Sequence, residues 1–370
     1  MHELPEKLER VVRLCHTHRL GGILLTTQPN FAWITGGRSN RIDGSREPGN
    51  GAILITAEGR RFVVANQIEM PRLLDEALAG IPCEPIDYSW TSGLSTPSSL
   101  VELARTATSH SHIGADWPIP DTVSVEGAIT GARALLTTGE IERYKVLGRD
   151  IGAAIGQFCR GLEPGLFEDA VARGASDSVA ALGARATVVL VGADDRIARY
   201  RHPTPTPLPW RQLLMLVVCA ERHGLVVAVT RLVSAGPAPS EVVARTEAAA
   251  RVFERLLDAT RTGATGREIY SVAAAAYAAC GFPGEETRHH QGGPIGYQAR
   301  DWLAHPSSDA RVEARQAFAW NPSITGTKVE ETALLLDDHM EIISGSPEWP
   351  SMEMQIRGRR LLSPLVLERR

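Results

Sequence analysis

The densest group of chemically active side chains in the sequence lies in residues 288–293, which read Arg-His-His-Gln-Gly-Gly. Imidazole is the side chain whose ordinary pKa, about 6.5, lets it accept and donate protons near neutral pH. A further histidine, His202, stands before a proline in residues 200–203. The polar, glycine-rich segment is hard to explain as packing, so we interpret it as part of a site. The alternative is a tight turn with exposed imidazoles.

The composition excludes several classes of partner. The chain has 370 residues, of which 43% are hydrophobic and 22% charged, which is enough for two globular domains. A net charge of −4 gives no basic bias, so we expect neither nucleic acid nor an anionic membrane as a partner. Five scattered cysteines without a CxxC pair indicate reduced thiols, and no signal peptide or membrane span is evident. A cytoplasmic protein is therefore expected.

Helix-like and strand-like segments alternate in the first part of the chain, which is typical of an α/β domain. We place this domain at residues 1–138. The expected helices are 6–18, 68–78 and 100–106, and the expected strands are 22–26, 31–35, 52–56, 61–65, 84–88 and 112–116, with a hairpin between 52–56 and 61–65.

The remainder of the chain, residues 139–370, is expected to form an α+β domain. Thr137 and Glu140 have the spacing of a capping box, so a helix should begin there and run through residues 141–158. Its other expected elements are strands at 186–191, 213–219 and 225–229 and helices at 240–261 and 266–280. Strands and helices do not alternate regularly here, which favours α+β over α/β.

The order of these segments resembles that of the creatinase, prolidase and aminopeptidase P family. The resemblance rests on residues 138–142 (Thr-Gly-Glu-Ile-Glu), 229–231 (Val-Thr-Arg), the glycine-rich stretch near 293 and residues 329–332 (Val-Glu-Glu-Thr). It implies a pita-bread fold for residues 139–370, preceded by a smaller creatinase-like N-terminal domain of residues 1–138.

The same resemblance implies five ligand positions for a pair of metal ions. In this sequence those positions hold Val217, Ala228, Gly293, Asn321 and Glu330. Valine, alanine and glycine have no side-chain donor atom, and one amide with one carboxylate is too few ligands for two ions. We therefore expect no metal and no cofactor.

The resemblance also places polar residues on the substrate side of the pocket. His202 matches the histidine that shuttles protons in creatinase, a metal-free relative, and His289 matches a substrate-contacting histidine. We expect His202, His289 and Glu330 to be catalytic. The expected substrate-binding residues are His290, Gln291, Tyr297, Arg300, Asn321 and Lys328.

Some of these residues have a purely structural alternative. His202 could be an ordinary hydrogen-bonding loop residue, and Glu330 a strand-end carboxylate paired with Lys328 or Arg231. Other reactive side chains are expected to be structural from the start: Cys219 and Trp320 in the core, His16 and His18 on a helix surface, and Asp194 and Asp195 in a loop.

These features favour a metal-independent hydrolase that cleaves a C–N bond of a small amino-acid-derived substrate. A non-catalytic binding protein and a metal-free lyase remain as alternatives. The resemblance also implies a homodimer in which the N-terminal domain covers the partner's pocket. We expect Arg38 or Arg41, in the polar loop 36–41, to contact an anionic group of the substrate across that interface.

Overall fold

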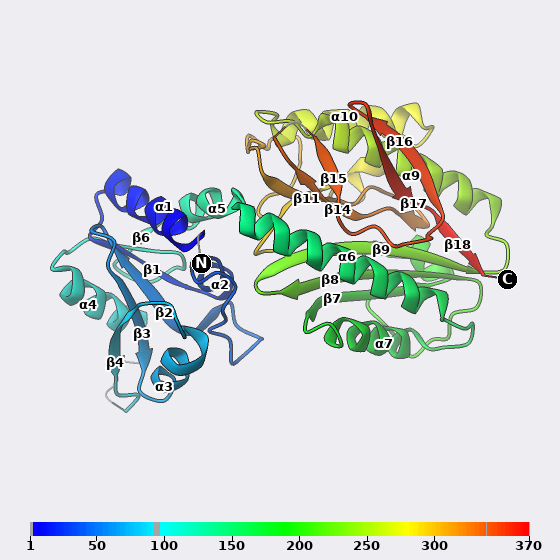
Figure 1. Ribbon diagram of the computed structural model, residues 1–370. Helices are drawn as coiled ribbons and strands as arrows, with labels where there is room; N and C mark the ends of the chain where they lie inside the picture. The colour runs from blue at the N-terminus through cyan, green and yellow to red at the C-terminus, as the bar shows by residue number, and fades with distance from the viewer. Residues whose placement is uncertain (1–2, 92–96, 338, 370) are drawn as a thin grey trace. The chain divides into compact units, whose positions relative to one another are not determined.

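A computed structural model describes residues 3–91, 97–337 and 339–369 of the chain. Its backbone contacts divide the protein into two compact units, Met1–Ala134 and Leu135–Arg370, which Figure 1 shows as ribbons. Each unit has its own sheets and helices. Among the described residues, no helix combines the length and the apolar composition needed to cross a bilayer.

The first unit contains a six-stranded sheet in the order β4-β3-β2-β1-β5-β6. Its strands are β1 (Gly22–Thr27), β2 (Pro48–Thr56), β3 (Arg61–Asn66), β4 (Glu84–Tyr88), β5 (Ile113–Ala115) and β6 (Val123–Ser124). Strands β2 and β3 form the expected antiparallel hairpin. Every other neighbouring pair except β1–β2 is parallel, so only β2 runs against the common direction.

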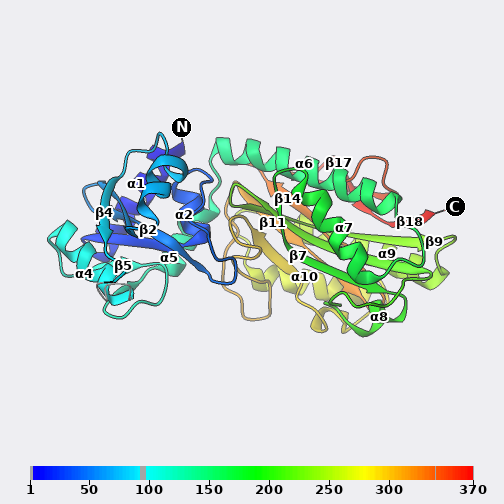
Figure 2. The same ribbon diagram turned by 90° about the horizontal axis from the view of Figure 1, so that it is seen from below.

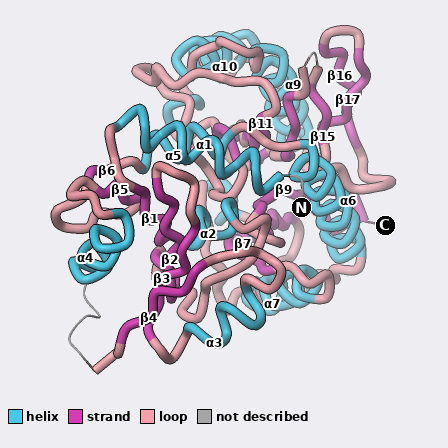
Figure 3. Tube along the Cα trace, turned by 60° about the vertical axis from the view of Figure 1, so that its left-hand side comes forward, coloured by secondary structure: helices cyan, strands magenta, loops and turns pink. Residues whose placement is uncertain are grey.

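Helices flank both faces of this sheet, as Figure 3 shows. They are α1 (Glu3–His18), α2 (Gln28–Ile34), α3 (Met70–Arg72) with the π-helical turn η1 (Leu73–Ala77), α4 (Pro97–Thr108) and α5 (Glu126–Ala134). Helices α1, α2 and α5 contact one another, whereas α4 packs on β1 and β5. The core on the α4 side includes Leu24, Leu54, Val64, Val101 and Ala104.

The strand expected at residues 31–35 is wrong, because these residues lie in helix α2 and its C-terminal turn. The run Phe-Ala-Trp-Ile-Thr is entirely buried, so it carries no alternation that separates a buried helix from a buried strand. Pro29 in the first turn of α2 is the local signal for a helix start. The other expected strands and helices of this unit are present.

The second unit opens with the predicted capping box. The Glu140 amide donates to Thr137 Oγ1 at 3.2 Å, and the Thr137 amide donates to Glu140 Oε2 at 2.7 Å. These bonds satisfy amides that the first turn of a helix leaves free, and they start the long helix α6 (Thr138–Arg160). Helix α7 (Glu168–Ala180) follows, which the sequence reading missed.

Two four-stranded sheets form the body of this unit. One has the order β18-β9-β8-β7, from β7 (Arg185–Ala193), β8 (Leu213–Arg222), β9 (Leu225–Ala235) and β18 (Val366–Arg369). The other has the order β10-β11-β14-β15, from β10 (Gly292–Ile295), β11 (Gln316–Trp320), β14 (Glu331–Leu335) and β15 (Met340–Ile342). Helices α6 and α7 pack on the first sheet (Figure 2).

The second sheet is covered by α9 (Ser240–Ala259) and α10 (Gly266–Ala279), whose apolar faces share a core with Phe318 and Trp320. Short elements complete the unit: α8 (Asp195–Arg199), η2 (Glu285–Thr287), β12 (Ser323–Ile324), β13 (Thr327–Lys328), β16 (Ser351–Ile356) and β17 (Arg359–Pro364). The unit thus has two sheets, each covered by a pair of helices, without a regular strand–helix alternation along the chain. This is the expected α+β domain.

Hydrogen bonds join the two sheets where β9 meets the start of β14. The Thr230 amide donates to the Glu330 carbonyl at 3.2 Å. The Ala228 amide donates to Thr332 Oγ1 at 2.8 Å. Residues expected at the site therefore converge on this junction from both sheets. As expected, Cys219 and Trp320 are buried and His16 and His18 are exposed. The carboxylate of Asp194 accepts amides 211–213 and so caps its loop.

Candidate active site

Two short connections of the second unit bring the predicted histidines together. His202 lies in the loop after α8, and His289 and His290 lie between η2 and β10. His289 Nε2 is 3.0 Å from His202 Nε2. The His289 and His290 rings lie next to each other, tilted by 37°, with centroids 4.4 Å apart. Residues 87 positions apart in sequence thus form one imidazole cluster, as the sequence reading expected.

The His202–His289 contact holds a single proton. Two Nε2 atoms at hydrogen-bond distance need one ring to donate and the other to accept, so the pair contains one N–H between them. On its other side, His289 Nδ1 lies 3.2 Å from Ser323 Oγ. His289 is 8% exposed, whereas His202 is exposed. His202 is therefore the ring that water or a substrate reaches, and His289 supports it from within.

Burial keeps the imidazoles neutral. Burial, followed by the positive charge of Lys328, lowers the pKa of His289 to about 2. Burial and the nearby Arg300 lower the pKa of His290 to about 4. The pKa of the more exposed His202 is also lowered, by partial burial and by Lys328. All three rings are thus neutral near pH 7, and the two more buried rings, His289 and His290, are weaker bases than a free imidazole.

Glu330 lies beside the cluster and is held by two cations. Its Oε2 is 2.9 Å from Lys328 Nζ, and its Oε1 is 2.9 Å from Arg300 Nη2. Thr230 Oγ1 donates to Oε2 at 2.7 Å. Although burial alone would raise the pKa of Glu330, these partners lower it to about 2. The carboxylate is 1% exposed and permanently charged near neutral pH.

The neighbouring Glu331 differs from Glu330 in its partners. It pairs with Arg231 at 2.7 Å and contacts Ser344 Oγ. Burial outweighs these contacts and raises the pKa of Glu331 to about 7. The expected alternative for Glu330, an ion pair with Lys328 or Arg231, is therefore correct for Lys328, while Arg231 belongs to Glu331.

The five positions at which the resemblance implies metal ligands do not fit a pair of ions. Val217 and Ala228 are buried apolar residues of β8 and β9. At Gly293 an added Cβ would lie 2.0 Å from the Trp302 carbonyl oxygen, so the backbone has no room for a side chain. Asn321 is 2% exposed, and both oxygens of Glu330 already have cationic or hydroxyl partners.

The ring nitrogens of His202, His289 and His290 all lie within 4.8 Å of one another. A cluster of this size is compact enough for a single transition-metal ion. However, Lys328 and Arg300 place positive charge beside the rings, since both lower the pKa of His290. The electrostatics favour neutral imidazoles that transfer protons or meet an anion over imidazoles that hold a cation.

Two residues expected to bind substrate are committed elsewhere. Gln291 is 0% exposed; its Oε1 accepts from Tyr277 Oη at 2.9 Å, and its Nε2 donates to the Glu286 and His289 carbonyls. It therefore shapes the histidine loop and does not face a ligand. Tyr297 Oη donates to Glu140 Oε1 at 2.6 Å, so this hydroxyl supports the start of α6.

Other expected residues keep free hydrogen-bonding capacity. Among the residues expected at the site, three buried side-chain atoms have no hydrogen-bond partner in the described part of the chain: His290 Nδ1, Arg300 Nε and Asn321 Oδ1. Buried polar atoms without a partner are rare in folded proteins, because each costs about 1–3 kcal/mol. These three atoms are available to water or a substrate group.

Sequence reasoning missed three residues that support the cluster. Ser323 contacts His289, and Arg201 Nη1 donates to Ser323 Oγ at 3.4 Å. Glu285 forms an ion pair with Arg201 and accepts the Thr325 amide at 3.0 Å. Arg201 adjoins His202 in sequence, which was a usable signal. Ser323 and Glu285 carry no local motif.

The loop 36–41 belongs to the first unit. Arg38 is exposed, and Arg41 Nε donates to Gln28 Oε1 at 2.6 Å. Neither residue lies in the unit that holds the histidines, so a contribution to a pocket from these arginines stays a prediction about assembly.

Comparisons with known proteins bear on the second unit and on the whole fold. The sequence model of metallopeptidase family M24 matches residues 142–342, more than half of the chain. No curated protein matched the sequence.

Solved structures match over almost the full length. A dipeptidase PepE from Mycobacterium ulcerans superposes with a TM-score of 0.79 at 17% identity, covering 99% of this chain and 98% of its own. A prolidase from Pyrococcus horikoshii gives a TM-score of 0.76 at 16% identity, covering 92% and 98%. The N-terminal domain of the FACT complex subunit SPT16 from chickpea gives 0.69 at 11% identity, covering 92% and 96%. At these identities the likeness shows the pita-bread fold, with its smaller N-terminal α/β domain, and nothing further.

Proposed function

The chain belongs to metallopeptidase family M24, and from that premise we propose that it is a metal-independent hydrolase in which histidines replace the metal-bound water. The reaction is cleavage of a C–N bond in a small amino-acid-derived substrate. The observation that carries the proposal is the His202–His289 contact of 3.0 Å, placed beside Lys328, Arg300 and Glu330.

The metal half of the family's site argues for independence from metal. Three ligand positions have no donor atom, and Gly293 has no room for a side chain. Glu330, the surviving carboxylate, is neutralised by Lys328 and Arg300. Two cations of the protein thus pair with the carboxylate oxygens that a metal ion would need. The proposed chemistry therefore comes from the imidazoles.

Proton transfer through His202 can supply that chemistry. A water molecule attacks the substrate carbon, and the remaining ring nitrogen of His202, Nδ1, accepts its proton. The Nε2 proton of His202 is meanwhile held by His289 Nε2, which orients the ring and spreads the charge. The C–N bond then breaks, and His202 returns the proton to the departing nitrogen. The water is consumed as hydroxyl on carbon and hydrogen on nitrogen, so atoms and charge balance.

The charges around the cluster select for an anionic substrate group. Lys328 and Arg300 carry two positive charges and Glu330 one negative charge, and Arg201 is paired with Glu285. The excess positive charge suits a carboxylate, which an amino-acid-derived substrate has. The free Nε of Arg300 is a donor for such a group.

A non-catalytic binding protein is the second candidate. It is favoured by the likeness to a domain of a subunit of the FACT complex, which shares the fold. A metal-free lyase would use the same histidines. The five unpaired cysteines suit a reducing compartment, so we place either activity in the cytoplasm.

A turnover screen tests the proposal. Purified protein is incubated with N-substituted amino acids, dipeptides, amidines and ureas in chelator, and products are identified by mass. Gain of one water in the products supports a hydrolase, and loss of a small molecule without water supports a lyase. Because His305 is an exposed histidine of the same unit, His305→Ala is the matched control for His202→Ala. No turnover in any class, with saturable binding of some compounds, would favour the binding protein.

We also propose a homodimer in which Arg38 or Arg41 reaches the partner's pocket. Exposure of Arg38 supports this. A mixture of Arg41→Ala and His202→Ala proteins tests it, because hybrid dimers would contain one pocket with both native residues. Statistical mixing should then restore about a quarter of native activity. A monomer in light scattering, or no restored activity, would reject the contribution of Arg41 across the interface.

A further inference from the structure

The first unit contains a cavity of 310 Å³ that has no place in the chemistry proposed above. It lies within this unit alone, lined by residues between Thr26 and Ile119. Binding pockets for small molecules typically start near 300 Å³, so this cavity suits a small ligand.

The topology of the sheet explains why a cavity forms there. Strands β1, β3, β4 and β5 run in the same direction, and their carboxyl ends share one edge of the sheet. The cavity is lined at this edge by Thr26 of β1, Asn66 of β3, Tyr88 of β4 and Trp117 just after β5. The start of the reversed strand β2 lies at the same edge. In open α/β sheets this edge is where ligands bind.

The walls of the cavity are apolar and its polar groups are mainly donors. Val64, Leu100 and Ile119 line the walls together with the aromatic residues Tyr88 and Trp117. Among the described residues, no hydrogen bond is made by the side chains of Arg46 and Asn50, which also line it. The same holds for Nδ2 of Asn66, the hydroxyl of Tyr88 and Nε1 of Trp117. Because these donors include one guanidinium, they favour an anionic ligand.

A nearby carboxylate is not part of this set. Asp116, 2% exposed, accepts from the amides and hydroxyls of Thr26 and Thr27 and from Asn30 Nδ2. Its charge is therefore spent on fixing the end of β1. It makes Thr26 a rigid part of the cavity wall. Arg46 is the charged residue among those that line the cavity, and the carboxylate near enough to feel its charge, Asp43, is not one of the lining residues.

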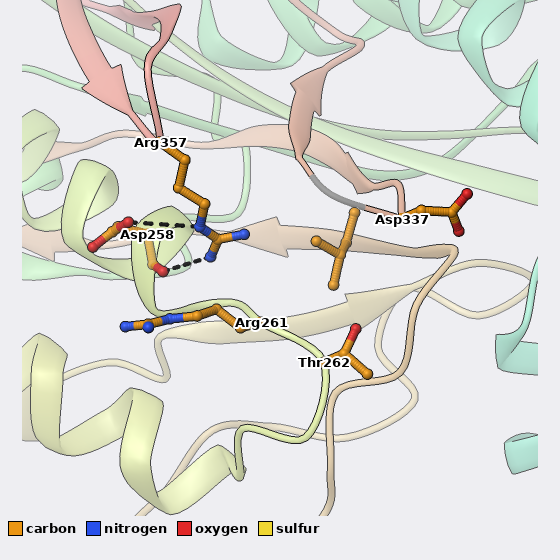
Figure 4. Close-up of a pocket in the computed structure, with 6 residues that line it drawn as sticks. Asp258, Arg261, Thr262, Asp337 and Arg357 are labelled. Atoms are coloured by element: carbon orange, nitrogen blue, oxygen red, sulfur yellow. Dashed lines mark hydrogen bonds and ion pairs between the residues drawn. The ribbon is translucent and has the colours of Figure 1, made fainter.

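The hollow in Figure 4 is a useful contrast, because its Arg357 forms an ion pair with Asp258 at 3.7 Å. It is lined by Asp258, Arg261 and Arg357. Arg357 Nη2 donates to the Asp258 and Thr260 carbonyls at 2.6 and 2.9 Å, which caps the end of α9. Arg357 thus has a structural role, and this hollow offers little to a ligand.

We propose that the cavity of the first unit binds a small planar aromatic carboxylate, with the ring between the apolar walls and the carboxylate at Arg46. The donors on Asn50 and Asn66 would complete the shell of the anion. This site is separate from the histidine cluster and does not depend on the proposed hydrolysis.

Binding of four probes to the full-length protein tests the proposal. Benzoate and indole-3-carboxylate are compared with benzamide and indole-3-carboxamide by calorimetry and saturation-transfer NMR. Both carboxylates should bind saturably, one per chain. Arg46→Ala should weaken their binding about tenfold, the loss expected for one charge-assisted contact, and should leave the amides unchanged. Arg13→Ala, an exposed arginine on α1, is the matched control.

Two further variants locate the binding. Leu100→Trp should fill the cavity and abolish binding of all probes, while His289→Ala should have no effect. Melting temperatures check that each variant is folded, and Arg46 is exposed, so its removal does not disturb the core. Absence of saturable binding by every probe at millimolar concentration would overturn the proposal. So would binding that a folded Leu100→Trp protein retains, or that His289→Ala removes.

Discussion

The strand pair β8–β9 and the loops that carry the histidines face the same junction of the second unit, but they hold opposite kinds of residues. On the strands, Val217 and Ala228 are 3% and 0% exposed and contribute to the apolar core. In the loops, His202, His289 and His290 form a polar cluster with ring nitrogens within 4.8 Å. The positions at which the family resemblance implies metal ligands are core residues here, whereas the loops hold the polar cluster that we propose meets the substrate.

Glu330 and Glu331 show a similar contrast between two consecutive residues. Both are buried, yet the pKa of Glu330 is lowered to about 2 and that of Glu331 is raised to about 7. Two cations and a hydroxyl hold Glu330, while one arginine and one serine hold Glu331. An internal ion-pair network, rather than sequence position, decides the charge at this junction.

The largest effect on activity should come from replacing His202. His202→Ala should lower kcat by roughly 10²–10⁴, the usual loss for a general acid or base, with a smaller change in KM. Steady-state kinetics with the substrate found by the screen measure this. Because the pKa of His202 is lowered, the native rate should fall only at pH values below its ordinary pKa of 6.5. Full activity of His202→Ala would assign the cluster to binding.

A large change in stability should come from breaking the ion pairs of Glu330 with Lys328 and Arg300. Glu330→Gln leaves the cations of Lys328 and Arg300 in the protein interior without a counter-charge. Such a change should lower the free energy of unfolding by about 3–5 kcal/mol. Denaturant unfolding measures it. The matched control is Glu341→Gln, which breaks the half-exposed pair with Lys145 and should cost less than about 1 kcal/mol. Equal losses in the two variants would show that Glu330 is not the anchor of this network.

An effect that is smaller when taken per pH unit concerns acid stability. The pKa of His289 is about 2 in the folded state against 6.5 ordinarily, so the unfolded chain binds more protons between these values. Its contribution to stability is complete above pH 6.5 and is lost as the pH falls toward 2. The free energy of unfolding should therefore decrease by about 1.4 kcal/mol per pH unit for this residue alone.

The variant His289→Gln isolates that contribution. Its unfolding free energy should depend less steeply on pH between 6 and 4 than that of the native protein, by about one proton. His305→Gln, at an exposed position, should leave the slope unchanged. An unaltered slope in His289→Gln would mean that His289 titrates normally and is not buried as a neutral ring.

Local sequence patterns predicted much of this architecture. The Thr137–Glu140 capping box, the β2–β3 hairpin and the α9 and α10 helices are confirmed because their signals lie within a few residues. The segment 31–35 was misread because a fully buried run has no periodicity. Helix α7, with a small-residue composition of Ala, Gly and Ser, gave too weak an apolar stripe to be noticed.

The site was only partly readable, for a different reason. Histidines stand out by type, so His202 and His289 could be named before their 3.0 Å contact was known. Gln291 and Tyr297 are equally polar, but their partners, Tyr277 and Glu140, are set by tertiary packing. Ser323 and the pairing of Arg300 with Glu330 depend on contacts across 34 and 30 positions, which no local motif encodes.

Metal content measured together with activity tests the central claim most directly. The native protein is purified without added metal, analysed for Mn, Co, Zn, Fe and Ni by plasma mass spectrometry, and assayed before and after dialysis against chelator. We predict far less than one ion per chain and unchanged turnover after chelation, because Val217, Ala228 and Gly293 provide no ligands. About two ions per chain, with activity that chelation removes and metal restores, would contradict the account.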